Sequence, residues 1–428
     1  MKLLVFCVDA LCASDIPAMR GLPGFSYVLN NGALVEKVYP VFPALTYSCH
    51  TSILTGRYVA GHGIAHNEIL RRGGGLNAAW HGLRGDVLGK TLLDYAKENG
   101  LTTCSLSWPV SGGADIDMNF PMIVPYGYKG YEPERWLDGS ATKSLMDRYF
   151  YKHGRHIKGP ARNLDLFTMA VALDILEDFP QPDIMLVKLC DLDGARHTFG
   201  VYHEAAATQL RQHDMEFCAI LEALRRRGTL DETNVVVLGD HGQTDIDDVL
   251  LMNELLRQEG LLRAEAGVLK DYDALCHSTG LAAYVELRDP QDAGIKCRVR
   301  AFLESLRKDP KIALGTVMDA EEAYAAYQVR GPFDFVIESE RRIAFGESFG
   351  DGAIWGSKVA GDHKIGAATH GGSPYREEVT TFMACGPAVQ KGVVVAGRPM
   401  VDEAPTMAGM LGFTMDDIDG KPITEILR

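Results

Sequence analysis

Short, uninterrupted runs of apolar residues recur along the chain and are typical of the buried strands of a parallel sheet. The runs are Leu3–Val8, Ile184–Leu189, Val235–Leu238 and Thr381–Ala384. Between the runs, two stretches have helical spacing and good terminal signals. They are Leu92–Asn99, between Thr91 and Gly100, and about Glu204–Arg227, which precedes Gly228. The alternation of strands and helices predicts an α/β fold with a mostly parallel central sheet flanked by helices.

The segment 261–360 has a different pattern. Leu281–Leu287 and Phe333–Glu338 alternate between apolar and polar residues, which is typical of antiparallel strands with one buried face. Val299–Lys308 and Ala320–Tyr327 have helical spacing. We therefore expect a smaller α+β cap at 261–360, inserted into a catalytic core formed by 1–260 and 361–428.

Composition narrows the class of protein. The 428 residues are 46% hydrophobic and 23% charged, which is ordinary for a globular protein and argues against disorder. A net charge of −14 argues against binding of nucleic-acid polymers or anionic membranes. Nine scattered cysteines without a CxxC pair predict reduced thiols, and no apolar stretch is long enough to span a membrane. We expect a cytoplasmic protein, and its oligomeric state stays open.

Acidic residues and histidines follow three of the predicted strands. Asp9 follows the first run, Asp193 and His197 follow the second, and Asp240 and His241 follow the third. The carboxyl ends of parallel strands meet at one edge of a sheet, so these side chains should converge. Carboxylates and neutral imidazoles suit zinc, and they also admit manganese or iron. Taken singly, each residue fits a surface pair, a turn or a helix cap, but their joint placement favours a metal centre.

Two further residues fit such a centre. His370 precedes the fourth apolar run, and Thr46 lies where a loop enters an apparent helix. A hydroxyl at a helix start lies at the positive end of the helix dipole, where backbone N–H groups receive an anion. Coordination to a metal would lower the pKa of that hydroxyl and make it a nucleophile. Without a metal, Thr46 would simply be an N-cap.

The order of these motifs resembles the alkaline phosphatase superfamily and, within it, the type I phosphodiesterase/nucleotide pyrophosphatase family. The resemblance spans Val8-Asp9, Phe42 to Asn67, Asp193 to Gly200, Leu238 to Gly242 and Thr369 to Pro387. It implies an alkaline-phosphatase-like fold and two zinc ions. One zinc would be held by Asp9, Thr46, Asp240 and His241, and the other by Asp193, His197 and His370. It also implies hydrolysis of a small anionic phosphodiester or nucleotide pyrophosphate through a phospho-threonine on Thr46.

The same resemblance suggests residues that bind substrate. Asn67 follows His62-Gly63-Ile64, where the family places an amide that donates to a phosphoryl oxygen. Tyr47 matches an aromatic that stacks on a nucleobase, and Trp108 and Tyr126 resemble walls of the same pocket. The alternatives are a polar turn residue for Asn67 and packing beneath the metal site for the aromatic residues.

One departure from the family pattern leaves the substrate class open. The chain has Ser48-Cys49-His50 where the family usually has Pro-Asn-His. A phosphonate hydrolase of the phosphonoacetate type, or a phosphomonoester hydrolase with the same metal core, is the main alternative. A sulfatase is disfavoured because the Cys/Ser-x-Pro-x-Arg segment is missing. A non-catalytic, metal-stabilised binding protein is disfavoured because Thr46 and the whole ligand set are present.

Overall fold

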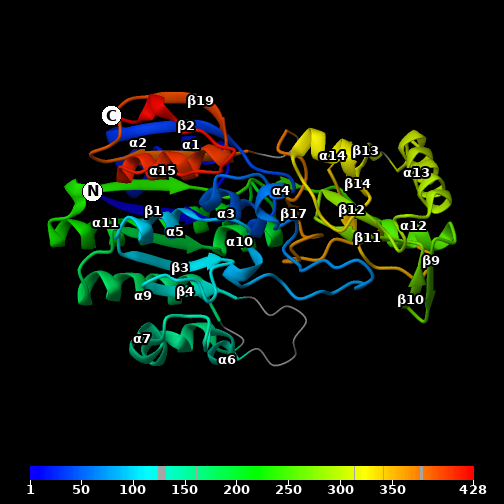
Figure 1. Cartoon of the computed structure of the whole chain (residues 1–428), viewed down its shortest axis with the longest axis horizontal. Helices are drawn as coiled ribbons and strands as arrows, with labels where there is room; N and C mark the ends of the chain where they lie inside the picture. The colour runs from blue at the N-terminus through cyan, green and yellow to red at the C-terminus, as the bar shows by residue number, and fades with distance from the viewer. Residues whose placement is uncertain (124–131, 160–161, 313, 341, 376–378) are drawn as a thin grey trace.

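The computed structural model describes residues 1–123, 132–159, 162–312, 314–340, 342–375 and 379–428. Its largest element is an eight-stranded sheet, whose strands are spread from β19 at the top to β4 at the bottom of Figure 1. In spatial order the strands are β19 (Val394–Pro399), β2 (Gly32–Tyr39), β18 (Thr380–Cys385), β6 (Thr233–Leu238), β1 (Lys2–Val8), β5 (Ile184–Leu189), β3 (Thr103–Pro109) and β4 (Met118–Met122). The four apolar runs of the sequence are the central strands β18, β6, β1 and β5.

The sheet is mostly parallel, with one reversed strand. β1 pairs in parallel with β5 and β6, and β3 pairs in parallel with β5 and β4. β18 is antiparallel to both β6 and β2, so the expectation of a parallel strand at Thr381–Ala384 is wrong. The reversal matters for the site, because the start of β18 lies at the same sheet edge as the carboxyl ends of β1, β5 and β6.

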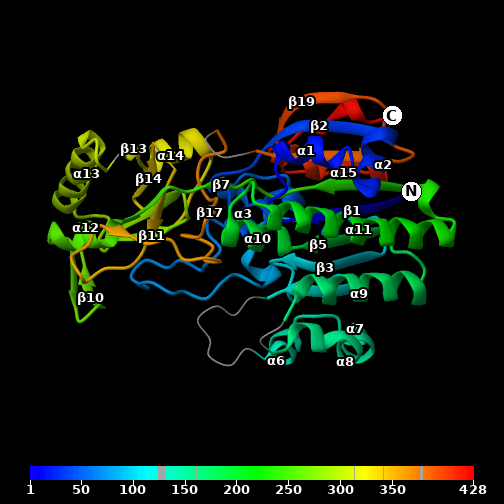
Figure 2. The same cartoon turned by 180° about the vertical axis from the view of Figure 1, so that it is seen from behind.

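Helices cover both faces of the sheet (Figures 1 and 2). One face packs on α3 (Thr46–Thr55), α5 (Leu92–Glu98) and α15 (Glu403–Leu411). The other face packs on α2 (Pro23–Asn31), α9 (Leu164–Asp178) and α11 (Glu204–Arg227). The predicted helix ends are confirmed, because Thr91 caps α5 with a capping box and Gly228 ends α11 in a left-handed conformation.

A smaller sheet lies beyond the carboxyl ends of the central strands (Figure 1). Its strands are β11 (Ala274–Ser278), β12 (Ala282–Leu287), β14 (Phe335–Ser339) and β13 (Leu314–Asp319), in that spatial order. All of its pairs are antiparallel, as the alternating pattern predicted. The associated helices are α12 (Met252–Gln258), α13 (Ala293–Lys308) and α14 (Ala320–Tyr327). The apolar cluster under this cap begins at Leu250, and the boundaries 261–360 stay a prediction.

Short strand pairs connect the two parts. β8 (Asp248–Leu251) pairs with β15 (Ile343–Gly346) and β16 (Trp355–Gly356), and β7 (Thr244–Asp245) pairs with β17 (Ala368–Thr369). Within the described parts of the chain, no helix combines the length and the apolar character that crossing a lipid bilayer requires.

Candidate active site

The candidate nucleophile lies at the first residue of a buried helix. α3 begins at Thr46 directly after Leu45, whose backbone is extended. The Thr46 side chain is buried, and its Oγ1 lies 3.1 Å from Nε2 of His241. The structure therefore places the Thr46 hydroxyl at the start of a helix, next to a histidine that follows β6.

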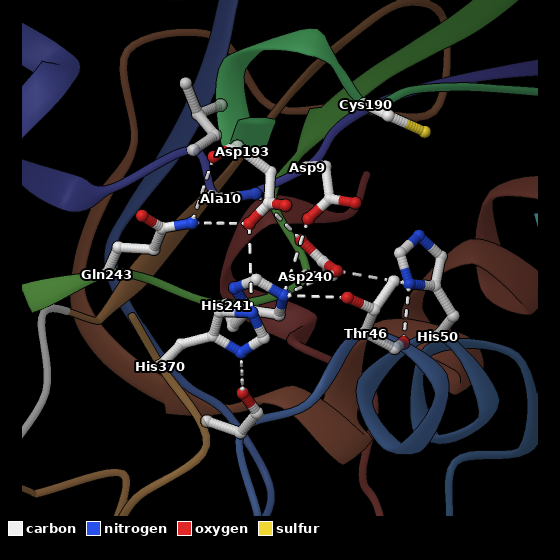
Figure 3. A network of polar contacts seen from close by, with 12 residues as sticks. Asp9, Ala10, Thr46, His50, Cys190, Asp193, Asp240, His241, Gln243 and His370 are labelled. Carbon is white, nitrogen blue, oxygen red and sulfur yellow. Dashed lines mark hydrogen bonds and ion pairs between the residues drawn. The ribbon is translucent and has the colours of Figure 1, made fainter. Parts of the chain in front are cut away.

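Three oxygen atoms surround Nε2 of His241, and Figure 3 shows the side chains pointing toward one another. Besides Thr46 Oγ1, they are Oδ2 of Asp240 at 3.2 Å and Oδ1 of Asp9 at 3.4 Å. Asp9 follows β1, and Asp240 and His241 follow β6, its neighbour in the sheet. The structure thus brings together the four residues that the resemblance assigns to one metal.

The second predicted group assembles beside the first. Asp193 and His197 lie one turn apart on α10 (Asp191–Phe199), with His197 Nε2 3.2 Å from Asp193 Oδ1. His370 Nε2 lies 3.8 Å from the same oxygen. Possible metal-ligand atoms gather in two groups among the described residues: Asp193 with His197 and His370, and Asp193 with Asp9 and His241. Asp193 therefore faces both positions, whereas the resemblance assigned it to one.

The three imidazoles are oriented as metal ligands would be. Each has its Nδ1 within hydrogen-bond distance of a backbone carbonyl: Ala368 for His197 at 2.8 Å, Gly242 for His241 at 3.1 Å and Ala44 for His370 at 2.7 Å. A ring that donates from Nδ1 keeps the lone pair of Nε2, the atom that faces the carboxylates. In addition, Asp9 Oδ1 and His197 Nε2 are buried without a hydrogen-bond partner in the described structure. These residues fit metal ions.

Close packing fixes His370 at this place. Gly371 has a positive φ of 89°, and a Cβ added to it would lie 1.7 Å from the carbonyl oxygen of Thr279. The Thr279 hydroxyl donates to the carbonyl oxygen of Gly371 at 2.7 Å, and the backbone N–H of Leu281 donates to the carbonyl oxygen of His370 at 3.0 Å. Glycine after His370 is therefore required for the base of the cap to approach the ligand loop.

Burial and neighbouring charges set the protonation of the ligands. Burial, and secondly the adjacent His241, lower the pKa of His370 to about 3, so this ring is neutral at pH 7. Burial acts to raise the pKa of Asp193, but the His197 and His370 rings outweigh it and hold that pKa well below the usual range. A neutral imidazole beside an ionised carboxylate is the state in which both bind a cation.

Of the four predicted substrate residues, two lie near the nucleophile, one lies away from the site and one is outside the described residues. The side-chain oxygen of Asn67 accepts a hydrogen bond from the backbone N–H of Tyr47 at 3.1 Å, which places Asn67 next to the nucleophile. Tyr47 is 0% exposed, and the Trp80 ring meets it edge-on with centroids 5.4 Å apart. Trp108 is not brought to the site: it is buried, and its indole N–H donates to the carbonyl of His50 at 3.4 Å. Tyr126 lies outside the described residues.

Three polar residues that sequence reasoning missed support the ligands. His50 Nδ1 lies 3.2 Å from Asp240 Oδ2 and 2.7 Å from the carbonyl oxygen of Thr46. The amide nitrogen of Gln243 donates to Asp193 Oδ1 (Figure 3). Lys188 Nζ lies 2.6 Å from Asp9 Oδ2. A lysine within the otherwise apolar run Ile184–Leu189 was the signal that could have revealed the third contact.

Cys49, where the chain departs from the family pattern, is 0% exposed and packs in the hydrophobic cluster shared by α3 and α15. None of the nine cysteines, all of which are in described parts of the chain, forms a disulfide.

Comparisons with known proteins show which solved structures share this fold and which sequences are similar. Murine ectonucleotide pyrophosphatase/phosphodiesterase 5 superposes with a TM-score of 0.68 at 17% identity, over 100% of both chains. An inactive variant of that protein in complex with AMP gives a TM-score of 0.66, again over 100% of both chains at 17% identity. Member 7 of the ectonucleotide pyrophosphatase/phosphodiesterase family from Mus musculus is 20% identical over 410 residues, which are 94% of this chain and 81% of that protein.

A second relative and a family match extend these similarities. Venom phosphodiesterase 2 of Crotalus adamanteus is 22% identical over 264 residues, covering 57% of this chain and 27% of the venom enzyme. The sequence pattern of the type I phosphodiesterase / nucleotide pyrophosphatase family matches residues 3–363, which include six of the seven predicted ligands. The chain therefore belongs to the type I phosphodiesterase/nucleotide pyrophosphatase family of metal-dependent hydrolases.

Proposed function

We propose that this protein is a two-zinc hydrolase of phosphodiesters or nucleotide pyrophosphates that forms a phospho-threonine on Thr46. The observation that carries the proposal is the position of Thr46 Oγ1, 3.1 Å from His241 Nε2 at the start of a buried helix. One ion would be held by Asp9, Asp240, His241 and Thr46, and the other by His197 and His370, with Asp193 next to both. Bound zinc lowers the pKa of a coordinated hydroxyl and offsets charge on the phosphoryl group.

The chain's own residues then supply positioning. Thr46 reacts as the alkoxide: its oxygen bonds to phosphorus while the bond to the leaving oxygen breaks in line. Water hydrolyses the phospho-threonine in a second displacement. Because Thr46 is the first residue of α3, the positive end of the helix dipole would favour negative charge at the attacking oxygen. Asn67, whose carbonyl is held by the N–H of Tyr47, is left with its amide nitrogen to donate to a phosphoryl oxygen.

A substrate panel tests the reaction type. The panel is nitrophenyl phosphate, bis-nitrophenyl phosphate, nitrophenyl phenylphosphonate and phosphonoacetate, each with and without zinc. We expect the diester to be hydrolysed fastest, and metal analysis to find two ions per chain. Thr46→Ala should abolish turnover and keep at least one ion, whereas Thr46→Ser should retain part of the rate. An active Thr46→Ala variant would remove the nucleophile assignment.

One observation favours the alternative, a phosphonate or phosphomonoester hydrolase with the same metal core. Tyr47 occupies the position expected to stack on a nucleobase, but it is 0% exposed and the edge of Trp80 lies against it. A substrate without a nucleobase needs no open aromatic face at this position. If phosphonoacetate or nitrophenyl phosphate is hydrolysed far faster than the diester, this alternative replaces the leading proposal.

The compartment is a separate proposal. We keep a cytoplasmic location as the expectation because none of the nine cysteines forms a disulfide, although six of them are buried and two more are only partly exposed within the fold. Fractionation of cells that express the chain with its natural ends would test it, and recovery in the secreted fraction would contradict it.

A further inference from the structure

A lysine is buried directly behind one of the metal ligands. Lys188 lies near the end of β5 and is 0% exposed. Its Nζ lies 2.6 Å from Asp9 Oδ2, 2.9 Å from the Cys190 sulfur and 3.5 Å from the Met122 sulfur. An ammonium group has three N–H donors, and here each has a partner. Sulfur is a weak acceptor, so the Asp9 carboxylate is the partner that makes a buried charge tolerable.

Because of this contact, the two carboxylate oxygens of Asp9 have different surroundings. Oδ2 is committed to Lys188, whereas Oδ1 lies 3.4 Å from His241 Nε2 and has no hydrogen-bond partner in the described structure. Lys188 therefore determines which oxygen faces the proposed metal position. It also holds the carboxylate in one orientation before any cation arrives, because the side chain of Asp9 cannot turn without breaking the ion pair.

The same lysine offsets charge. Asp9 and Asp193 have oxygens within 4.8 Å of each other and of a His241 nitrogen, and Asp240 reaches that histidine as well. Three carboxylates so close together, two of them buried and one partly buried, repel one another when no cation lies between them. A fixed positive charge behind Asp9 reduces that repulsion in the metal-free protein. Once dications are bound, the same charge repels them.

We propose that Lys188 is a positioning residue of the metal centre: it presents Asp9 through Oδ1 alone and acts as a built-in cation that stabilises the metal-free site while moderating metal affinity. The proposal rests on the assignment of Asp9, Asp193 and Asp240 as ligands in the proposed function. It adds that the centre is tuned by a residue that never touches the substrate.

The test compares metal-free and zinc-loaded protein in three full-length variants. Melting temperature is measured after chelator treatment and at saturating zinc, and zinc affinity is measured by competition with a chromophoric chelator. Lys188→Met should lower the melting temperature of the metal-free protein more than that of the loaded protein. Zinc affinity at the Asp9 position should rise, by about tenfold or more, because a cation near a dication has been removed.

Lys364→Met is the matched control. Lys364 is also largely buried between carboxylates, 2.8 Å from Glu68 and 3.0 Å from Glu347, but it contacts none of the proposed ligands. It should lower both melting temperatures equally and leave zinc affinity unchanged. Lys188→Arg keeps the charge and should show the wild-type zinc affinity and the wild-type difference between the two melting temperatures, even where both are lower.

The outcomes separate the possible failures. If Lys188→Met lowers both melting temperatures equally with unchanged affinity, or if Lys188→Arg raises the affinity, the role of Lys188 is refuted. Should Lys188→Met fold only when zinc is present, the proposal is supported, and should it fail to fold at all, the Lys188→Arg measurement decides. If the wild-type protein binds no zinc, the metal assignment of the proposed function fails instead.

Discussion

The contact between Asn67 and the nucleophile helix makes a sharp prediction, because the two ends of one amide have separate tasks. The carbonyl oxygen accepts the backbone N–H of Tyr47 at 3.1 Å, and the nitrogen is the proposed phosphoryl donor. Asn67→Asp keeps an acceptor for that N–H and removes the donor. Loss of one donor to a developing negative charge costs about 2.7–4 kcal/mol in the transition state, which is a decrease in kcat of about 10²- to 10³-fold.

Asn67→Ala removes both contacts and should show the same decrease in kcat together with a loss of stability of about 1 kcal/mol for the buried hydrogen bond. The assay measures kcat on the best substrate of the panel at saturating zinc, alongside urea unfolding of each variant. Asn253→Ala is the matched control, because Asn253 is a buried amide that accepts the N–H of Cys276 at 2.8 Å in the cap. It should cost stability and leave kcat unchanged.

The reasoning about Asn67 is refuted if Asn67→Asp keeps kcat within about threefold of wild type while zinc content is unchanged. It is also refuted if kcat decreases in proportion to the loss of stability in Asn67→Asp, Asn67→Ala and Asn253→Ala alike, because the Asn67 amide would then affect kcat only by stabilising the fold.

Three further predictions concern support and stability. His50→Ala removes the imidazole next to the Asp240 carboxylate and should weaken zinc binding or activity about 10- to 100-fold. The control is His62→Ala in the adjacent α4 (Val59–His62), because His62 is also buried and its loss should affect stability alone. Zinc titrations that give the same affinity for the two variants would contradict this. Glu254→Gln should lower the free energy of unfolding by up to about 3 kcal/mol at pH 7, because contacts with Arg257 lower the pKa of Glu254 to about 2. A lowered carboxylate pKa stabilises the fold above the unfolded value near 4.5, so the difference from wild type in urea unfolding should shrink as the pH falls from about 4.5 toward 2, and a constant difference would be inconsistent with the ion pair. Phe217→Ala, deep between the sheet and α2, should cost about 3–5 kcal/mol by denaturant unfolding without changing zinc content, and a cost below about 1 kcal/mol would contradict tight packing there.

Much of the architecture follows from local patterns. Apolar runs too short for helices gave the central strands, and the ends of α5 and α11 followed from Thr91, Gly100 and Gly228. These features depend on residues adjacent in the chain, whose preferences act before tertiary contacts form. The direction of β18, in contrast, does not follow from local patterns. An apolar run packs equally well in either direction, so only its neighbours β2 and β6 make it antiparallel.

The residues of the candidate site can also be separated into features that follow from local sequence and features that follow from packing. The residue types that follow the strands can be read from the chain alone, and the geometry of a parallel sheet requires Asp9, Asp193, Asp240 and His241 to meet at one edge. The surroundings of these residues depend on the folded structure. It places Lys188 behind Asp9 and covers Tyr47 with Trp80, and it sets Asp193 between both ligand groups. Such contacts join residues far apart in the chain, and their distances depend on the packing of whole elements rather than on any local pattern.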